Sequence, residues 1–263
     1  MAVKKLIKIW LMYTSRALQS DLLTTWAGVL FIIGKIVRFL LFFIFLFVIL
    51  SAVKDLAGYN REQVIFFFLI FNLVDVIVQF LFRGVYHFRP LVVSGEYDLD
   101  LLKPLPSFFR PIFSHTDLAD FVTLVPLWGY FLWFVFINHL FRGMGDLILF
   151  CLLLVNALIL GFAFHLLVCA VCVLTTEIDH LVWVYRDLTS MARFPTDIYF
   201  KWVQYLLTFT IPVIILFTVP AKALLGLLSW PWVILALVIS GLFLWGSLRF
   251  WRFALSKYSS ASS

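Results

Sequence analysis

Long apolar segments with few charges alternate with short polar connections along the chain. Residues 147–174 and residues 223–248 contain no Asp, Glu, Lys or Arg. Because about 20 helical residues cross a bilayer core roughly 30 Å thick, each of these segments is long enough to cross a membrane. The short alternating segments of a membrane β-barrel are absent, and a helix satisfies its own backbone in lipid. The pattern therefore predicts an all-α integral membrane protein.

We predict a single transmembrane domain over residues 1–263 with six spans. The predicted spans are residues 25–53, 64–86, 118–137, 147–174, 178–194 and 231–250. The fifth span has an alternative, because residues 178–194 are charged whereas residues 202–221 are uncharged but contain Pro212 and Pro220. Hydropathy favours the second segment, and a polar helix packed inside a bundle favours the first. If the first segment crosses, residues 195–226 form a re-entrant element before the last span.

The composition and the basic residues extend this picture. Of the 263 residues, 64% are hydrophobic and 13% are charged, as expected for a membrane protein. With the N-terminus in the cytosol, the two short outer loops hold only Lys54, Arg61 and Arg142. The cytosolic side then holds Lys4, Lys5, Lys8, Arg16, Arg83, Arg89, Lys103, Arg110, Arg249, Arg252 and Lys257. The positive-inside rule therefore predicts that both termini are cytosolic. The net charge of +6 does not indicate nucleic-acid binding, because the basic residues cluster at membrane edges.

Residues 1–24 are predicted to form an amphipathic helix on the cytosolic membrane surface. Apolar residues recur there at helical spacing, and the basic residues fall mostly on the remaining surface of the helix. The apolar set is Leu6, Ile9, Trp10, Tyr13 and Ala17. The alternative is a basic flank to the first span.

The largest predicted cytosolic connection, residues 87–117, contains the segment SGEYDLDLLKPLP, residues 94–106. Acidic residues alternate there with Tyr and Leu, and two prolines stop any helix. A short, rigid, amphipathic element with an acidic edge suits docking onto a soluble partner. The alternative is a solvated loop that joins two spans.

Three motifs in this order resemble the permease subunits of bacterial ABC transporters of the type-2 exporter class. The chain is most similar to the ABC-2 family transporter proteins of about its own length. The first motif comprises Gly95, Glu96, Asp98, Leu101 or Leu102, Lys103, Pro104 and Leu105. The second is ARFPTDIY, residues 192–199, and the third is IPVIILFTVPAKALLG, residues 211–226. The resemblance covers essentially the whole chain.

The resemblance implies a permease that pairs with a second permease, identical or sibling, in the bacterial inner membrane, with a separate cytosolic ATPase bound beneath each chain. The element after the second span is then the coupling element, in which Glu96, Asp98, Leu101, Leu102 and Lys103 contact the ATPase. The stretch after Arg193, with Phe194, Pro195, Pro212 and Pro220, is then an extracellular re-entrant hairpin. The sequence contains no G-x-x-x-x-G-K-[ST] motif, so ATP and Mg²⁺ are expected on the partner and no cofactor on this chain.

Several ionisable residues fall within the predicted spans. Lys35 and Arg38 lie in the first span, and Asp75, Gln79 and Arg83 are spaced i, i+4, i+8 in the second. Since a charge that faces lipid at the bilayer centre costs about 3 kcal/mol, these groups should face the bundle interior or one another. One interpretation is a polar lining of the transport route. The other, which residue chemistry alone favours, is a structural ion pair, with Asp75 bound to Lys35 or Arg38.

Two other functions remain open from the residues alone. A stand-alone secondary transporter would work without partners, but the sequence shows no internal repeat. A lipid-modifying membrane enzyme would need an acid–base or metal cluster near the membrane surface. The only candidate cluster, between Glu177 and Asp187, has no diagnostic spacing, so no catalytic residue and no metal site are predicted. The sequence does not specify the cargo.

Overall fold

The computed structural model describes residues 3–23, 25–52, 55–140, 143–176 and 179–259. Within these ranges the chain is helical, and its only β-type pairing is an isolated bridge between Leu56 and Tyr59. The long helices are α1 (Val3–Leu23), α2 (Thr25–Ala52), α3 (Arg61–Phe82), α7 (Leu118–Ile137), α8 (Met144–Thr175), α9 (Asp179–Ser190) and α12 (Trp230–Lys257). The prediction of an all-α integral membrane protein is confirmed.

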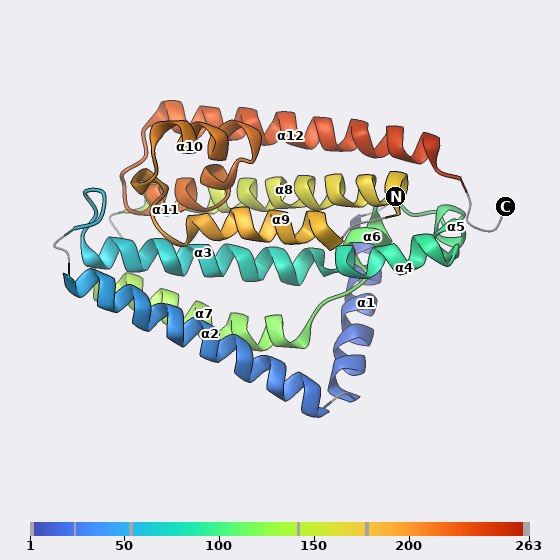
Figure 1. Ribbon diagram of the computed structural model, residues 1–263, viewed down its shortest axis with the longest axis horizontal. Coiled ribbons are helices and arrows are strands. Elements are labelled where there is room, and N and C mark those ends of the chain that lie inside the picture. Colours follow the sequence, from blue (N-terminus) through green and yellow to red (C-terminus); the bar gives the residue numbers. More distant parts are fainter. Residues whose placement is uncertain (1–2, 24, 53–54, 141–142, 177–178, 260–263) are drawn as a thin grey trace.

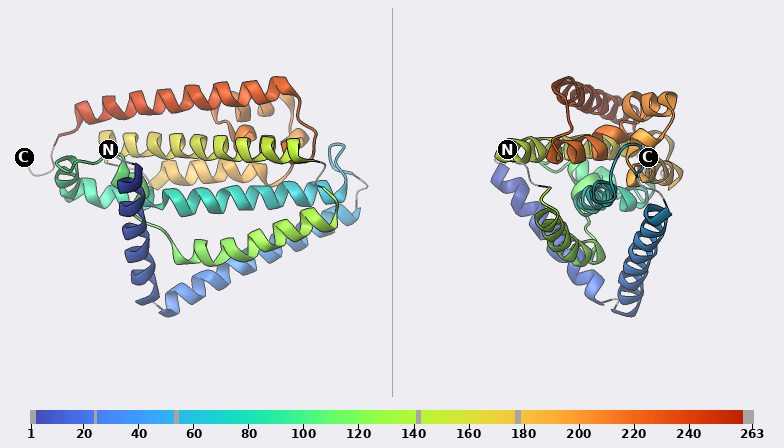
Figure 2. Two further views of the ribbon diagram at one scale, coloured as in Figure 1. Left: turned by 180° about the vertical axis from the view of Figure 1, so that it is seen from behind. Right: turned by 90° about the vertical axis from the view of Figure 1, so that its left-hand side faces the viewer.

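Shorter helices gather at the two ends of the molecule (Figure 1). The connection from α3 to α7 contains a 3-10 turn, Arg83–His87, and the helices α4 (Phe88–Val93), α5 (Glu96–Leu101) and α6 (Phe109–Phe113). The connection from α9 to α12 contains α10 (Lys201–Tyr205) and α11 (Val219–Leu224) at the opposite end. The end of α12 lies near α5, and α1 crosses the same end of the bundle (Figures 1 and 2).

The central helix of the bundle is α3. In its most apolar stretch 61% of the residues are buried, against 6% in α2. Every residue of α3 from Val64 to Phe71 is apolar and buried, as expected for a stretch of helix that is covered on all sides. Helix α2, by contrast, leans outward from the bundle together with α7 (Figure 2).

Helix α3 begins three residues before the predicted second span because Asn60 and Gln63 form a capping box. The Asn60 side chain accepts a hydrogen bond from the Gln63 backbone N–H at 2.9 Å, and the Gln63 side chain accepts one from the Asn60 backbone N–H at 3.1 Å. Likewise α12 continues to Lys257, past the predicted end of the sixth span at residue 250.

Among the described residues, five helices are long and apolar enough to cross a membrane, namely α2, α3 with its extension to Val93, α7, α8 and α12; a bent pair of shorter helices, Lys201–Thr210 and Ile214–Leu224, would be a sixth if it formed one span. Since α8 and α12 both end beside α5, the chain between them has to return once to the opposite end (Figure 1). Helix α9 makes this return, at residues 179–190 of the predicted span 178–194, and a 3-10 turn extends it to Arg193. Residue 178 lies outside the described residues.

The segment around Pro212 does not run the length of the molecule. Its two helical pieces, Lys201–Thr210 and Ile214–Leu224, bend by 86° at the break that contains Pro212. Both pieces stay at the end opposite α5, as a re-entrant element does (Figure 1). Hydropathy favours residues 202–221 over α9 for a physical reason. Helix α9 has polar side chains on the side where it meets other helices, but an average of hydropathy along the sequence counts them as if they faced lipid.

Helix α1 uses its predicted apolar stripe against the protein. Trp10 meets Phe80 of α3 edge to face, with ring centroids 6.3 Å apart, and Ala17 is buried. Other apolar side chains of α1, including Ile7 and Leu11, stay exposed. Location of α1 on a membrane surface stays a prediction, and its contact with that surface would be made by this second set.

Candidate functional site

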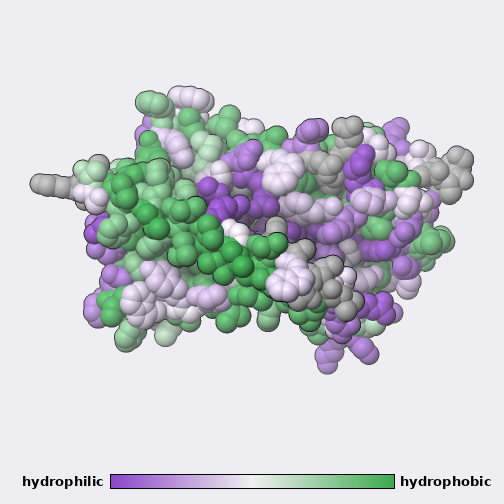
Figure 3. Space-filling model, turned by 60° about the horizontal axis from the view of Figure 1, so that its bottom comes forward, coloured by the Kyte–Doolittle hydropathy of each residue, from purple (hydrophilic) through white to green (hydrophobic). Residues whose placement is uncertain are grey.

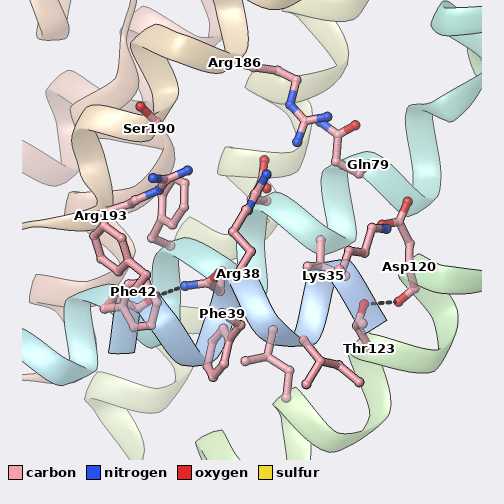
Figure 4. A pocket seen from close by; sticks show the side chains of 18 of the residues that line it. Lys35, Arg38, Phe39, Phe42, Gln79, Asp120, Thr123, Arg186, Ser190 and Arg193 are labelled. Atoms are coloured by element: carbon pink, nitrogen blue, oxygen red, sulfur yellow. Dashed lines mark hydrogen bonds and ion pairs between the residues drawn. The ribbon is translucent and has the colours of Figure 1, made fainter. Parts of the chain in front are cut away.

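Helices α2, α3, α7 and α9 line a cavity of about 930 Å³. All five polar residues predicted within the spans line it, namely Lys35, Arg38, Asp75, Gln79 and Arg83. The last three share one face of α3 because residues four apart in a helix lie above one another. The structure adds Asp120 from α7, and Arg186 and Arg193 from α9 and the turn after it (Figure 4). We call this space the polar cavity.

One side of the polar cavity is held by ion pairs between α2, α3 and the start of α7. Lys35 binds Asp120 in a short ion pair, and its Nζ lies 3.9 Å from Asp117 Oδ2. Arg83 Nη2 lies 2.7 Å from the same Asp117 oxygen. Lys35 therefore pairs with two carboxylates at the start of α7, whereas the sequence suggests a pairing of Asp75 with Lys35 or Arg38.

Sequence reasoning missed Asp117 and Asp120. Asp117 is the N-cap of α7, and its Oδ1 accepts a hydrogen bond from the Ala119 backbone N–H at 2.8 Å. An Asp directly before a long apolar run is a helix-start signal, and Asp120 in the first turn complements the helix dipole. This signal was present in the sequence, but the choice of Lys35 and Arg83 as partners depends on how α2, α3 and α7 pack.

The other side of the polar cavity gathers arginines. The guanidinium groups of Arg38, Arg186 and Arg193 lie close enough to Asp75 to interact with it electrostatically. Arg193 lies over two aromatic rings, 5.1 Å from the Phe42 centroid and 5.6 Å from the Phe71 centroid. Within the described part of the chain, Arg38 makes neither a hydrogen bond nor an ion pair.

Gln79 presents an unsatisfied donor in this region. Its Oε1 accepts a hydrogen bond from the Tyr86 hydroxyl at 2.9 Å, which orients the amide. Its Nε2 is buried and has no partner among the described residues, although Gln79 is only 3% exposed. The guanidinium of Arg186 lies beside Tyr86 and points toward Gln79 (Figure 4).

Phenylalanine rings form the apolar wall of the polar cavity. Phe39 and Phe42 of α2 stack on Phe68 of α3, with ring centroids 5.4 and 4.9 Å apart. Hydrophilic side chains show as a purple strip beside the green apolar surface in the middle of this face of the molecule (Figure 3). The polar cavity is thus amphipathic, because both charged groups and aromatic rings line it.

The predicted coupling element forms the end of the molecule that holds α5. Gly95 precedes α5 with φ of 75°, a left-handed conformation that favours glycine. Tyr97 is buried against Phe88 and Tyr258, and its hydroxyl donates to the Ser107 carbonyl at 3.1 Å. With Tyr97 turned inward, Leu99 and Leu102 turn outward and are 62% and 83% exposed.

We call the exposed side chains of Val93, Leu99, Leu101 and Leu102 the apolar ridge. Leu101 and Leu102 were predicted from the sequence as contact residues, whereas Val93 and Leu99 were not. Lys103 and Pro104 beside them are exposed, and Leu105 is half-buried. Whether these residues contact an ATPase stays a prediction.

The acidic residues of this element are partly engaged within the chain. Asp100 is buried, with its two carboxylate oxygens 2.7 Å from Lys103 Nζ and 2.6 Å from Arg110 Nη1. Glu96 lies 3.5 Å from Arg110 and is exposed. Glu96 therefore still presents its carboxylate to a partner, whereas Asp100 fixes the bend after α5.

Contacts with the spans hold the element in place. Trp251 of α12 donates its indole N–H to Ser107 Oγ at 2.9 Å.

Burial, followed by the nearby Asp98 carboxylate, raises the pKa of Tyr258 to about 12, so this hydroxyl stays protonated at neutral pH. Burial also lowers the pKa of His115, whose ring lies 3.9 Å from that of His87.

The predicted re-entrant residues lie at the opposite end. Phe194 and Pro195 follow the turn after α9, Pro212 lies at the 86° break, and Pro220 lies in the first turn of α11. The Phe194 ring packs on Phe42 of α2 at 5.7 Å. Asp197 binds Lys222 at 2.9 Å and accepts a hydrogen bond from the Tyr59 hydroxyl at 2.9 Å. Asp197 therefore joins the α2–α3 loop to α11.

This arrangement of long apolar helices defines a multi-pass α-helical membrane protein. The profile of the ABC-2 family transporter proteins matches residues 36–262, and the chain belongs to this family. It is a permease component of an ABC transporter, and the resemblance inferred from the three motifs is confirmed. The match begins within α2. No curated protein and no solved structure matches the chain significantly.

Proposed function

We propose that this chain is the membrane subunit of an ATP-driven exporter in the bacterial inner membrane. Two permease chains, identical or sibling, form the transport unit, and a separate ATPase that carries ATP and Mg²⁺ binds to each from the cytosol. The end of the molecule that holds α5 and the end of α12 faces the cytosol, and both termini are cytosolic.

The apolar ridge is the observation that carries this proposal. Leu99 and Leu102 project from a segment that is otherwise anchored by buried Tyr97 and Asp100. Helix α5, which carries Leu99 and Leu101, lies at one end of the molecule (Figure 1). Exposed leucines on a rigid, polar-rimmed element are typical of a protein-docking surface.

A mechanical path leads from the apolar ridge to the polar cavity. The ridge continues through α4 and the turn Arg83–His87, which carries Arg83, into α3, which carries Asp75 and Gln79. At Gly84 the turn packs so closely on α6 that an added Cβ would lie 2.8 Å from the Ile112 carbonyl oxygen, and Trp251 of α12 binds Ser107. Such close contacts would transmit a displacement of the element to α3 and α12. Closure of the ATPases on ATP would therefore move α3 relative to α2 and α7, and the polar cavity would alternate between two sides of the membrane.

The surface of α2 supports pairing with a second permease. Almost none of its apolar stretch is buried, although Lys35 and Arg38 lie on this helix within membrane depth. A charged group that faces lipid is costly, so a second chain that covers this side would shield the polar cavity.

The test is capture of the ATPase by the tagged, full-length chain from its own membranes. We expect an ABC ATPase to co-purify, with ATP hydrolysis in the eluate. Leu102→Asp should abolish both, because it places a charge in the centre of the apolar ridge. The matched control is Leu227→Asp at the opposite end, where the leucine is 42% exposed. Equal capture by wild type and Leu102→Asp would contradict the proposal.

A further inference from the structure

We infer that the polar cavity binds an amphiphile with a single anionic headgroup, a carboxylate or a phosphate, and an apolar body. This inference rests on the proposed function of the chain as a permease and names the chemical class of its cargo. Three independent features of the polar cavity support it: its charge, its free donors and its aromatic wall.

The lining of the polar cavity carries more positive than negative charges. Lys35 and Arg83 are compensated by Asp117 and Asp120 through the ion pairs described above. The rest of the lining holds three arginines, Arg38, Arg186 and Arg193, and only two carboxylates, Asp75 and Asp187. Asp187 is exposed, so it is the better solvated of these two carboxylates. One positive charge is left without a counter-charge, and an anion would supply it.

Two donors that line the polar cavity lack a hydrogen bond, whereas the one unsatisfied acceptor there, Asp120 Oδ2, lies 3.8 Å from Arg83 Nη1 and is compensated by it. Gln79 Nε2 is buried without a partner among the described residues, and Arg38 has neither a hydrogen bond nor an ion pair there. A guanidinium has five N–H donors and no acceptor, and an amide NH₂ has two donors. A ligand that satisfies both must accept hydrogen bonds. Carboxylate and phosphate oxygens do this, and charge assistance strengthens each bond.

The rest of the polar cavity suits an apolar body. Phe39, Phe42 and Phe68 form a stacked wall next to Arg38, and Arg193 is held over the Phe42 and Phe71 rings. A volume of about 930 Å³ lies within the usual range for pockets that hold a drug-sized ligand. Its lining includes outward-facing α2, so a chain can leave the polar cavity along an apolar surface.

The test is a binding measurement on the full-length chain in phosphatidylcholine nanodiscs, with empty nanodiscs as background. The anionic probe is 11-(dansylamino)undecanoic acid, and the neutral probe is the corresponding alcohol. We expect saturable binding of the acid that is at least about tenfold tighter than that of the alcohol.

The double variant Arg38→Gln/Arg193→Gln should lose about tenfold or more in affinity for the acid and should bind the alcohol as wild type does. Its matched control is Arg249→Gln, which removes an arginine that lies 5.6 Å from the centroid of Trp245 on α12. Unchanged binding of the alcohol shows that the double variant is folded. If the acid binds no better than the alcohol, or if the double variant retains wild-type affinity for the acid, the inference is wrong.

A second arm identifies the source of the anion. Nanodiscs that contain phosphatidylglycerol offer an anionic lipid headgroup in competition with the acid. If this lipid competes with the acid in wild type, a membrane lipid is the natural source, and if it does not, the source is a soluble amphiphile. Both results agree with the inference.

This experiment needs no ATPase, so its outcome is separate from that of the capture test. Binding of the acid without capture of an ATPase would contradict the proposed function and leave the inference intact. Capture of an ATPase without any preference for the acid would support the proposed function and contradict the inference.

Discussion

Asp117 has two roles at the start of α7. It caps the helix through the Ala119 N–H, and it pairs with Arg83 of α3 and Lys35 of α2. Asp120, one turn later, takes the closest contact with Lys35. Because both carboxylates are buried or nearly so, their ionised form is stable only while these cations are present.

Lys35→Met should therefore lower the free energy of unfolding by about 2 kcal/mol, because it leaves Asp120 without its closest counter-charge. Arg38→Met, one turn along the same helix, should change it by less than about 0.5 kcal/mol, because Arg38 has no ion pair to lose. Thermal unfolding of the purified proteins in detergent measures the difference. Equal stability of the two variants would show that the ion pairs of Lys35 contribute nothing.

Gly84 permits a close approach between two backbones. A Cβ at this position would lie 2.8 Å from the carbonyl oxygens of Pro111 and Ile112, which belong to α6. Gly84→Ala should destabilise the protein by about 2 kcal/mol, because the backbone of α6 has to move. Gly129→Ala is the control, since a Cβ there meets nothing within 4 Å.

The measurement for this pair is also thermal unfolding, together with ATPase capture. Gly84→Ala should weaken capture as well, because the shift of α6 moves the apolar ridge. A Gly84→Ala protein as stable as the Gly129→Ala protein would mean that α6 does not pack on the turn after α3.

At this scale the sequence predicts which residues share a face, but not which residues they meet. The i, i+4 spacing of Asp75, Gln79 and Arg83 suffices to place them on one lining. The partner of Lys35 depends on the packing of α2 against α7, which no local pattern encodes. For the same reason the sequence did not separate exposed Leu102 from buried Asp100.

Among the elements, α9 shows how a polar helix is accommodated within a bundle of apolar ones. Its Tyr185 packs edge to face on His165 of α8 at 5.3 Å, and its Arg186 and Asp187 line the polar cavity. Arg186 and Asp187 of α9 therefore lie beside the polar cavity. Hydropathy does not identify such a helix. It is required because α8 and α12 run in the same direction, so the chain between them has to return to the opposite end.

The element around α11 is held to the α2–α3 loop by Asp197. Lys222→Met removes the ion pair with Asp197, and we expect a loss of about 1 kcal/mol, a modest value because both side chains are partly exposed. The control is Lys201→Met in the neighbouring α10, where the lysine is exposed and has no ion pair among the described residues. Limited proteolysis after α9, with thermal unfolding, measures the effect. Faster cleavage of the Lys201→Met protein than of the Lys222→Met protein would contradict this role of Asp197.

In the whole molecule the two proposed sites, the apolar ridge and the polar cavity, lie at different positions along one helix bundle. The apolar ridge lies at the end that holds α5, and the polar cavity lies between α2, α3, α7 and α9. Helix α3 belongs to both, because it lines the cavity and continues into α4. The class of the protein could be predicted from its long apolar segments alone. The amphipathic character of the polar cavity did not, because it depends on the assembly of four helices that are distant in sequence.

The central claim is that the apolar ridge faces the cytosol, and the accessibility of single cysteines tests it most directly. Cys151, Cys169 and Cys172 are replaced by Ala, and Leu102→Cys or Leu227→Cys is introduced. A membrane-impermeant maleimide added to cells with a permeabilised outer membrane should label Leu227→Cys, and should label Leu102→Cys only after the inner membrane is opened. Labelling of Leu102→Cys in cells with an intact inner membrane would place the ridge outside and contradict the account.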